Sequence, residues 1–339
     1  MNEKRRKLIK LQDIAAKAGV SVNTVSRALR DKSDVGENTR QTIIKLAREL
    51  GYAIPEQVAA PNKNLLIGVL IQDILNPFYA NIVQGIESVL WQKRANFLFQ
   101  CSYRQESKEQ DILAFFSQQP VDGLLITSVV NPEQVIAHLK HSRLPTIFLS
   151  QHFEQYAVDY VINDNYEGAL LAVEHLINLR HTQIAYLAGL ESQSNAERFR
   201  GYQRALAAAG IPVNPWLIRA SDSTIESGYY VMKSLLQSDV KLTAVFAYND
   251  LIALGAIRAI KEANLRIPAD LSVVGYDDIV FAEFSEIPLT TVHQPTLEIG
   301  RKAAELLFEK IAAGPSPQPV QIVLKPYLAI RGTTSICPN

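Results

Sequence analysis

Side chains that can read the edges of DNA base pairs are grouped between residues 21 and 30. Ser21 is a good helix N-cap, and Val25, Ala28 and Leu29 recur at helical spacing, so we predict a short helix that buries this face. The opposite face carries Val22, Asn23, Ser26, Arg27 and Arg30. Asparagine can pair with adenine and arginine with guanine, while valine can contact a thymine methyl group. The pattern indicates a helix that enters a major groove; the alternative is a solvated face that contacts nothing.

Other polar side chains nearby are suited to phosphates. Thr24 and Ser26 lie on the same predicted helix, and Asn38, Thr39 and Arg40 open the next one. Hydroxyls, amides, guanidinium groups and helix N-termini bind the DNA backbone and so position a protein without reading sequence. We therefore expect these five residues to contact phosphates.

A second group of polar residues lies in the later part of the chain. Asn249 follows the apolar run TAVFAY, Asp277 follows LSVVGY, and Arg198 lies in the helical segment ERFRGY. Because ligands of α/β proteins bind at the carboxyl ends of parallel strands, we expect these side chains to converge on one cleft. There they could hold vicinal hydroxyl groups by several hydrogen bonds. The alternatives are that Asp277 and Asp278 cap a turn and that Arg198 is a surface charge.

Motifs of common enzyme classes are missing. The sequence has no G-x-S-x-G elbow, no P-loop, no G-x-G-x-x-G after a first strand and no H-E-x-x-H. His138 and His141 are three residues apart on a predicted helix, but no cysteine or third histidine is close, so a solvated face is favoured over a metal pair. Cys101 falls in a predicted strand and is interpreted as a core residue. We predict no enzyme activity, no metal site and no cofactor.

The elements that must position these residues divide into two kinds. From Leu65 onward, apolar runs alternate with segments of helical period. The runs are LLIGVLIQ (65–72), FLFQC (97–101), VDGLLIT (121–127), TIFLS (146–150), YVIN (160–163), QIAYLAG (183–189), TAVFAYN (243–249) and LSVVGYD (271–277). Such repeated β-α units exceed one doubly wound sheet, so we expect two Rossmann-like lobes with parallel sheets.

The first 52 residues have a different pattern and a different charge. Three short helical segments are predicted, with Gly19 and Gly51 ending the first and third. This part has a charge of +6 and the remainder has −6, which gives the chain its net charge of zero. A basic three-helix head indicates a helix-turn-helix domain that binds DNA, and AIPEQVAAPNKN (53–64) is interpreted as a linker.

Composition excludes several classes. The chain is 47% hydrophobic and 20% charged, which argues against disorder, and two cysteines cannot form a disulfide framework. No apolar run approaches the ~18 to 20 residues that span a bilayer, and the N-terminus lacks the apolar part of a secretory signal. We expect a cytoplasmic protein with no membrane partner.

At LQDIAAKAGVSVNTVSRAL the sequence resembles the LacI/GalR family of bacterial transcriptional regulators. The resemblance continues through RELGY, IGVLIQDILNPFY, VDGLLI, NDNYEGA, LINLRHTQIAYLAG, ERFRGYQRAL, AYNDLIALGAIRAI, LRIPADLSVVGYDD and PLTTVHQP. It implies an α/β fold with an N-terminal three-helix helix-turn-helix domain and a two-lobed core like that of periplasmic binding proteins. We expect the domain at residues 1–53, a hinge at 54–64, a first lobe of 65–163 with 293–320, and a second lobe of 164–292 with 321–339.

The resemblance also implies roles for individual residues. Positions that match Val22, Asn23 and Arg27 read bases in the family. Positions that bind a small-molecule effector match Arg198, Asn249, Asp277 and Gln294, and the segment that caps it matches Asp73, Asn76, Phe78 and Tyr79.

The sequence departs from the family at three places. Lys10 stands where a Ser or Thr usually caps the first helix, a loss of roughly 1 kcal/mol. The hinge lacks Tyr-x-Pro-Asn and the minor-groove leucine, so we expect reduced operator bending. Many members have an aromatic ring at the position of Ser223. Here the stacking ring would come from Phe78, Tyr79, Tyr166 or Phe281, or else the effector is an acyclic polyol, a sugar acid or a sugar phosphate.

We therefore predict a homodimeric DNA-binding regulator, most simply a repressor of a carbohydrate-utilisation operon. Its partners would be double-stranded operator DNA and a sugar or sugar derivative. The alternatives are a co-repressor-dependent regulator with a nucleobase-type ligand and a sugar-binding protein without a regulatory role.

Overall fold

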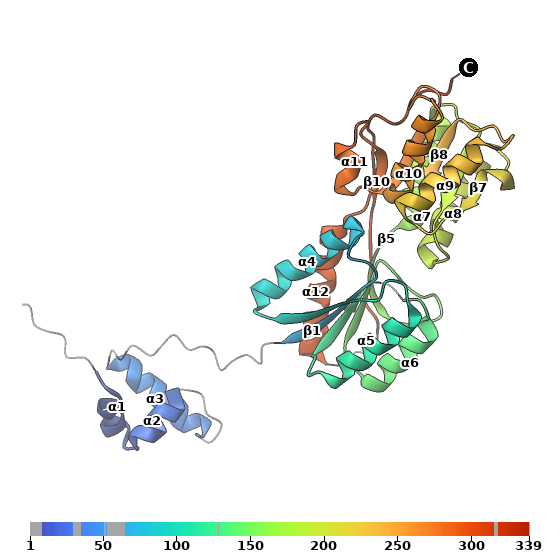
Figure 1. Cartoon of the computed structure of the whole chain (residues 1–339). Helices are drawn as coiled ribbons and strands as arrows, with labels where there is room; N and C mark the ends of the chain where they lie inside the picture. The colour runs from blue at the N-terminus through green and yellow to red at the C-terminus, as the bar shows by residue number, and fades with distance from the viewer. Residues whose placement is uncertain are drawn as a thin grey trace, which may run out of the picture. The chain divides into compact units, whose positions relative to one another are not determined.

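The computed structural model describes residues 9–29, 35–50, 52, 65–127, 129–314 and 318–338. It divides into two compact units, residues 1–65 and residues 66–339 (Figure 1). Each unit has a hydrophobic core of its own. The expected division into a small head and a large α/β body is therefore confirmed.

The first unit contains the three predicted helices, α1 (Leu11–Ala18), α2 (Val22–Leu29) and α3 (Glu37–Glu49). Their apolar faces meet in a small core that includes Ile14, Val25, Ala28, Ile43 and Ala47. Gly19 closes α1 in the left-handed conformation, with a φ of 67°, which allows the chain to turn at once into α2.

The caps of the two leading helices differ. In α2 the Ser21 hydroxyl accepts a hydrogen bond from the Thr24 backbone N–H at 3.0 Å, as predicted. In α1 the side chain of Lys10 makes no cap hydrogen bond, but the Asp13 carboxylate accepts from the Lys10 backbone N–H at 2.7 Å. Half of a capping box thus offsets part of the expected loss.

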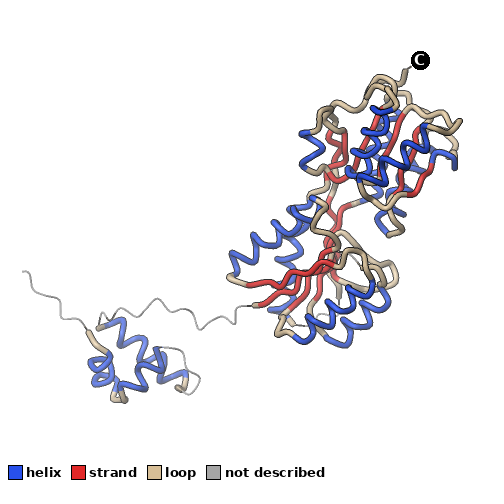
Figure 2. The backbone as a smooth tube through the Cα atoms, viewed as in Figure 1, coloured by secondary structure: helices blue, strands red, loops and turns tan. Residues whose placement is uncertain are grey.

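The second unit contains two six-stranded sheets. Figure 2 shows the strands gathered into two groups, one in each lobe. In the first lobe the strand order is β11-β5-β4-β3-β1-β2, and in the second it is β12-β10-β9-β8-β6-β7. The first sheet consists of β1 (Leu66–Ile71), β2 (Asn96–Cys101), β3 (Gly123–Ile126), β4 (Thr146–Leu149), β5 (Asp159–Asn163) and β11 (Gln321–Leu324). The second consists of β6 (Ile184–Ala188), β7 (Ile218–Ala220), β8 (Ala244–Ala247), β9 (Ser272–Asp277), β10 (Thr290–His293) and β12 (Tyr327–Ala329). All pairs are parallel except that β12 runs antiparallel to β10 at the edge.

Helices cover both faces of each sheet because the buried strands are apolar on both sides. In the first lobe α5 (Glu106–Gln118) and α6 (Pro132–Ser142) share a core with one face, while α4 (Pro77–Lys93) packs on α12 (Thr296–Ala313), which contacts β3, β4 and β5. In the second lobe α7 (Asn165–Asn178) and α8 (Gln193–Ala208) share one core, and α9 (Ile225–Leu236) and α10 (Asp250–Glu262) share the other. The short helix α11 (Val280–Phe284) follows β9.

The chain passes between the lobes three times. It crosses after β5, after β10 and after β11, since β11 pairs with β5 in the first sheet whereas β12 pairs with β10 in the second. The predicted assignment of residues 321–339 to the second lobe is therefore wrong for residues 321–324. This edge strand is only four residues long and half of them are exposed, so it gave no apolar run to recognise.

Candidate functional site

A cavity of about 540 Å³ lies within the second unit and is lined by residues of both lobes. In each sheet the chain adds a strand on one side of the first strand and then continues on its other side. This change of side falls between β1 and β3 in the first sheet and between β6 and β8 in the second. The segments that follow these four strands contribute Gln72, Thr127, Leu190 and Tyr248 to the lining. The cavity thus lies at the topological switch points of both sheets, where α/β proteins bind ligands.

Seven of the eight predicted effector residues line this cavity. They are Asn76, Phe78, Tyr79, Arg198, Asn249, Asp277 and Gln294. The eighth, Asp73, does not line it, and its carboxylate accepts a hydrogen bond from the backbone N–H of Leu75 at 2.9 Å. The side chain of Asp73 therefore supports the turn between β1 and α4 instead of facing the cavity.

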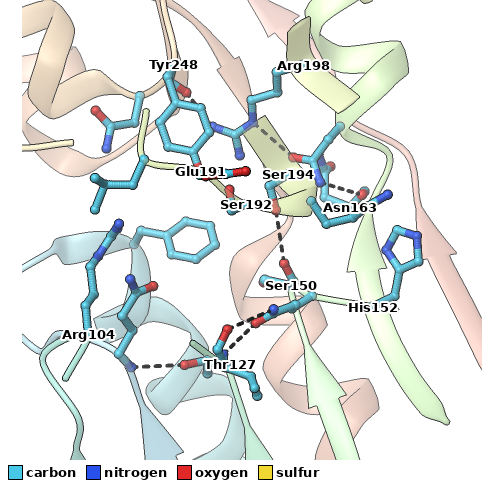
Figure 3. A pocket seen from close by; sticks show the side chains of 18 of the residues that line it. Arg104, Thr127, Ser150, His152, Asn163, Glu191, Ser192, Ser194, Arg198 and Tyr248 are labelled. Atoms are coloured by element: carbon cyan, nitrogen blue, oxygen red, sulfur yellow. Dashed lines mark hydrogen bonds between the residues drawn. The ribbon is translucent and has the colours of Figure 1, made fainter. Parts of the chain in front are cut away.

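Arg198 is the central cation of the cavity and is only 4% exposed (Figure 3). Its guanidinium carbon lies 3.6 Å from the ring centroid of Tyr276 and 4.4 Å from that of Tyr248. Nε donates to Asn165 Oδ1 at 3.0 Å, and Nη1 donates to the Tyr248 carbonyl and lies 3.6 Å from Asp277 Oδ1. The surface-charge alternative is therefore wrong, because aromatic faces and hydrogen bonds fix the group inside the lobe.

Asp277 is the carboxylate partner of this cation and is 7% exposed. It ends β9 with a φ of 113°, and Gln294 Nε2 donates to its Oδ1 at 2.6 Å. Burial raises the pKa of Asp277 to about 6, although Arg198 and the bond from Gln294 act in the opposite direction. Asp250, fully buried on α10, has a pKa raised well above its ordinary range by burial and by the charge of Asp277. Asp277 consequently keeps its proton to a higher pH than an exposed aspartate does.

The two predicted asparagines also cap helices. Asn249 Oδ1 accepts from the Ile252 N–H at 2.9 Å, and its Nδ2 donates to the Ser223 carbonyl at 3.2 Å. Asn76 Oδ1 accepts from the Phe78 N–H at 3.1 Å. These bonds fix the orientation of both amides where α10 and α4 begin, so their remaining hydrogen-bonding capacity faces the cavity from fixed positions.

Ser223 is buried and does not line the cavity, and its hydroxyl accepts from the Leu190 N–H at 3.3 Å. Of the four rings expected to replace an aromatic residue there, Phe78 and Tyr79 line the cavity. Tyr166 and Phe281 do not line it. The Tyr79 hydroxyl donates to Gln72 Oε1, which holds that ring at the first-lobe wall of the cavity.

Several lining residues were not identified from the sequence. Arg104 follows β2, Ser150, Gln151 and His152 follow β4, and Tyr248 follows β8. The rule that ligands meet the carboxyl ends of parallel strands would have found all of them, because each lies within three residues of such an end. Figure 3 shows Arg104 and Arg198 on different sides of the cavity, with Glu191 and Ser194 between the lobes.

The predicted DNA-reading face lies on the first unit. Val22 is 41% exposed, Asn23 and Arg27 are exposed, and Ser26 is half-buried. The hydroxyl of Thr24 forms a 2.8 Å hydrogen bond with that of Ser21. Arg30, the side chain of Asn38 and the predicted hinge at 53–64 lie outside the described residues.

The two residues that open α3 differ in their surroundings. Thr39 is exposed at the beginning of the helix, where a phosphate could reach it. Arg40 is half-buried and its Nη2 donates to the Val35 carbonyl at 3.5 Å. The arginine therefore supports the segment before α3.

The described part of the chain shows neither a metal site nor a membrane-spanning helix. There, no group of three or more His, Cys, Asp or Glu could hold a metal ion, and His138 is hydrogen-bonded to Ser117 at 2.8 Å. No described helix combines the length and the apolar character needed to cross a bilayer. Cys101 ends β2 and is half-buried instead of lying fully in the core.

Comparison with known proteins assigns both units. Residues 10–55 match the model of bacterial regulatory proteins of the lacI family, and residues 173–334 match that of a periplasmic binding protein-like domain. The HTH-type transcriptional repressor PurR of Aliivibrio salmonicida is 35% identical over 307 residues, which cover 89% of this chain and 92% of PurR. The transcriptional regulator CelR in complex with cellobiose superposes with a TM-score of 0.74 at 32% identity, covering 96% of this chain and 99% of CelR. The lac repressor dimer bound to operator and the anti-inducer ONPF superposes with a TM-score of 0.75 at 32% identity, covering 97% and 100%.

Proposed function

The chain belongs to the LacI family of bacterial regulatory proteins, which are DNA-binding transcriptional repressors, and from this we propose that a sugar-like effector in the cavity controls its operator affinity. The observation that carries the proposal is the pair Arg198 and Asp277. Both are more than nine-tenths buried, yet both face a cavity large enough for a small ligand. A buried cation and a buried carboxylate at one wall can donate to and accept from neighbouring hydroxyl groups.

Further lining groups support a polyhydroxylated ligand. Asn76, Thr127 and Ser194 bring amide and hydroxyl groups from both lobes. The Tyr248 ring lies against the guanidinium of Arg198, so that face of the ring is not available to stack on a ligand. A sugar needs many hydrogen bonds and only one aromatic contact, which Phe78 can supply. The related CelR is known in complex with cellobiose.

For the DNA-binding unit we propose that Val22, Asn23, Arg27 and Arg30 read base edges. Thr24, Ser26, Asn38, Thr39 and Arg40 would contact phosphates. The exposure of Val22, Asn23 and Arg27 on α2 supports this assignment, since a reading helix must present such side chains to the groove. The regulator would act in the cytoplasm, where its operator lies.

The active species in this proposal is a homodimer. Operators are commonly two-fold symmetric, and the related lac repressor binds its operator as a dimer. The short helix α11 exposes Val280, Phe281 and Phe284, the last of them by 77%. Three large apolar side chains on one exposed helix are suited to burial against a second copy.

Effector control would act through the two lobes. An effector can change DNA binding only if it binds the two lobe arrangements with different affinity, and such coupling is typically ~1 to 3 kcal/mol. Ligand that contacts Arg198 in one lobe and residues such as Thr127 in the other favours the arrangement in which both sets are close. That preference would be transmitted to the paired heads.

The experiment is a ligand screen followed by an operator-binding assay. Full-length protein would be screened by thermal shift against sugars, polyols, sugar acids, sugar phosphates and nucleobases, and each hit would be tested for its effect on operator affinity. A saccharide that raises the melting temperature and changes operator affinity is expected. If only nucleobases do so, the ligand class is wrong while the regulatory role stands; if no hit changes operator affinity, the cavity is not the control site.

A further inference from the structure

A chain of polar side-chain contacts connects the loop after β4 in the first lobe with Arg198 in the second: an ion-pair contact of His152 with Glu197, followed by two hydrogen bonds. His152 Nε2 lies 3.4 Å from Glu197 Oε1. Asn165 Nδ2 donates to Glu197 Oε2 at 3.2 Å, and Arg198 Nε donates to Asn165 Oδ1 at 3.0 Å. We name these four residues the inter-lobe chain. It ends on the cation that faces the cavity.

The members of the chain are shielded from water. Asn165 is 5% exposed and Glu197 is 8% exposed. His152 is also largely covered, and its ring lies 5.3 Å from that of Tyr160 on β5. Polar groups with so little solvent depend on one another for hydrogen bonds, so a change at one member disturbs the next.

The direction of each hydrogen bond is fixed by chemistry. A guanidinium only donates, so the amide oxygen of Asn165 must face Arg198 and its NH₂ group must face away. A carboxylate only accepts when it is ionised, so Glu197 is a suitable partner for that NH₂ group. The second oxygen of Glu197 then faces His152 and Gln193, whose Nε2 lies 3.4 Å from it. The Asn165 NH₂ group also donates to the Asn163 carbonyl at 3.4 Å, so Glu197 and that carbonyl together hold the amide with its oxygen toward Arg198.

We propose that Glu197 is a positioning residue that couples Arg198 in the effector cavity to the contact between the lobes at His152. A ligand that draws the guanidinium toward itself weakens its bond to Asn165, and the change passes through Glu197 to the first lobe. Conversely, contact with His152 holds Arg198 in the orientation that the ligand needs. This inference rests on the proposed function of the cavity, but its test uses no effector, so the two can fail separately.

Another contact between the same lobes supplies a control. Ser194 Oγ donates to the Ser150 carbonyl at 3.4 Å, which also joins α8 to the loop after β4. Among the described residues, Ser194 is hydrogen-bonded to neither Asn165 nor Glu197, so its loss removes an inter-lobe bond without interrupting the inter-lobe chain.

The test measures solvent exchange of the Arg198 Nε–H by NMR on the full-length chain labelled with ¹⁵N-arginine. The signal is assigned from its loss in Arg198→Lys. His152→Leu removes the contact with Glu197 and is expected to raise the exchange rate by up to about fivefold, the factor for complete loss of the Arg198–Asn165 hydrogen bond at about 1 kcal/mol net. His152→Gln keeps a donor for Glu197 and should restore most of the protection, while Ser194→Ala should leave the rate unchanged. The proposal is overturned if His152→Leu has the native rate or if Ser194→Ala raises it equally.

A second set of variants tests the direction of the bonds even if His152→Leu proves unstable. Asn165→Asp alone places a second carboxylate against Glu197 and should increase exchange at Arg198 more than His152→Leu does. Combined with Glu197→Gln, the new carboxylate again has a donor on one side and Arg198 on the other, so protection should return toward the native value. If the double variant exchanges as fast as Asn165→Asp, Glu197 does not position Arg198 through Asn165.

Discussion

Replacing Asp277 by asparagine is expected to remove a pH-dependent loss of stability. Burial raises the pKa of this carboxyl from its ordinary 3.8 to about 6. Between these values the folded chain holds a proton that the unfolded chain has released, so the free energy of unfolding falls as the pH rises through this range. The difference corresponds to about 3 kcal/mol, since each pKa unit is worth about 1.4 kcal/mol. The loss of stability is complete at pH values above the folded-state pKa of about 6, and there is no loss below the unfolded-state pKa of 3.8.

Urea denaturation at pH 4, 5, 6, 7 and 8 would measure this contribution. In the native chain, ionisation of Asp277 should lower the free energy of unfolding increasingly up to pH 7. Asp277→Asn resembles the protonated acid, so its free energy of unfolding should lack this decrease. The free energy of unfolding of the native chain should therefore fall relative to that of Asp277→Asn as the pH rises, by about 3 kcal/mol for Asp277 itself, with a further change from Asp250 because its pKa responds to the charge of Asp277. Asp270→Asn is the control, because Arg266 lowers the pKa of Asp270 to about 2 and its titration lies below this range. Parallel curves for the native chain and Asp277→Asn would refute the burial argument.

The remaining predictions concern binding and assembly. Arg27→Ala should weaken cognate operator binding by roughly 1 to 3 kcal/mol and relax specificity at one base pair, measured by fluorescence anisotropy on a set of operator variants; unchanged affinity would reject its reading role. Arg198→Ala should keep operator binding but lose the response to a saccharide that acts on the native protein, so a normal response counts against the cavity assignment. Operator affinity should fall steeply between 50 and 200 mM salt, and a flat dependence would contradict phosphate contacts by the head. Phe284→Glu should shift the dimer toward monomer in analytical ultracentrifugation, because it places a charge among the exposed apolar side chains of α11; an unchanged sedimentation profile would exclude α11 from the interface.

Local sequence patterns predicted most of the elements. The apolar runs that became β1, β3, β6, β8 and β9 are fully buried on both faces, so they were recognisable as continuous stretches. The strands β7, β11 and β12 are short, lie at edges and are partly exposed, so their sequences resemble loops. That is why the last boundary between the lobes was misplaced.

The site could be predicted only in part. Asn249 and Asp277 were found because each follows an apolar strand, and Arg198 because its helical segment ERFRGY matches an effector-binding position of the family. Asp73 satisfied the same rule and still points elsewhere, since a short side chain in a turn can satisfy its own backbone. Local pattern does not distinguish these two outcomes.

The sequence by itself determined the kinds of element, the separation of a basic three-helix head from an α/β body, and the family resemblance. These follow from the periodicity of apolar residues and from charges that are close along the chain. Only the tertiary structure decided that Arg198 lies between two tyrosine rings, that Asp277 has a raised pKa, and that Asn165 and Glu197 connect Arg198 to His152. Burial and hydrogen-bond geometry depend on residues far apart in the sequence, and these meet only when the two lobes have folded.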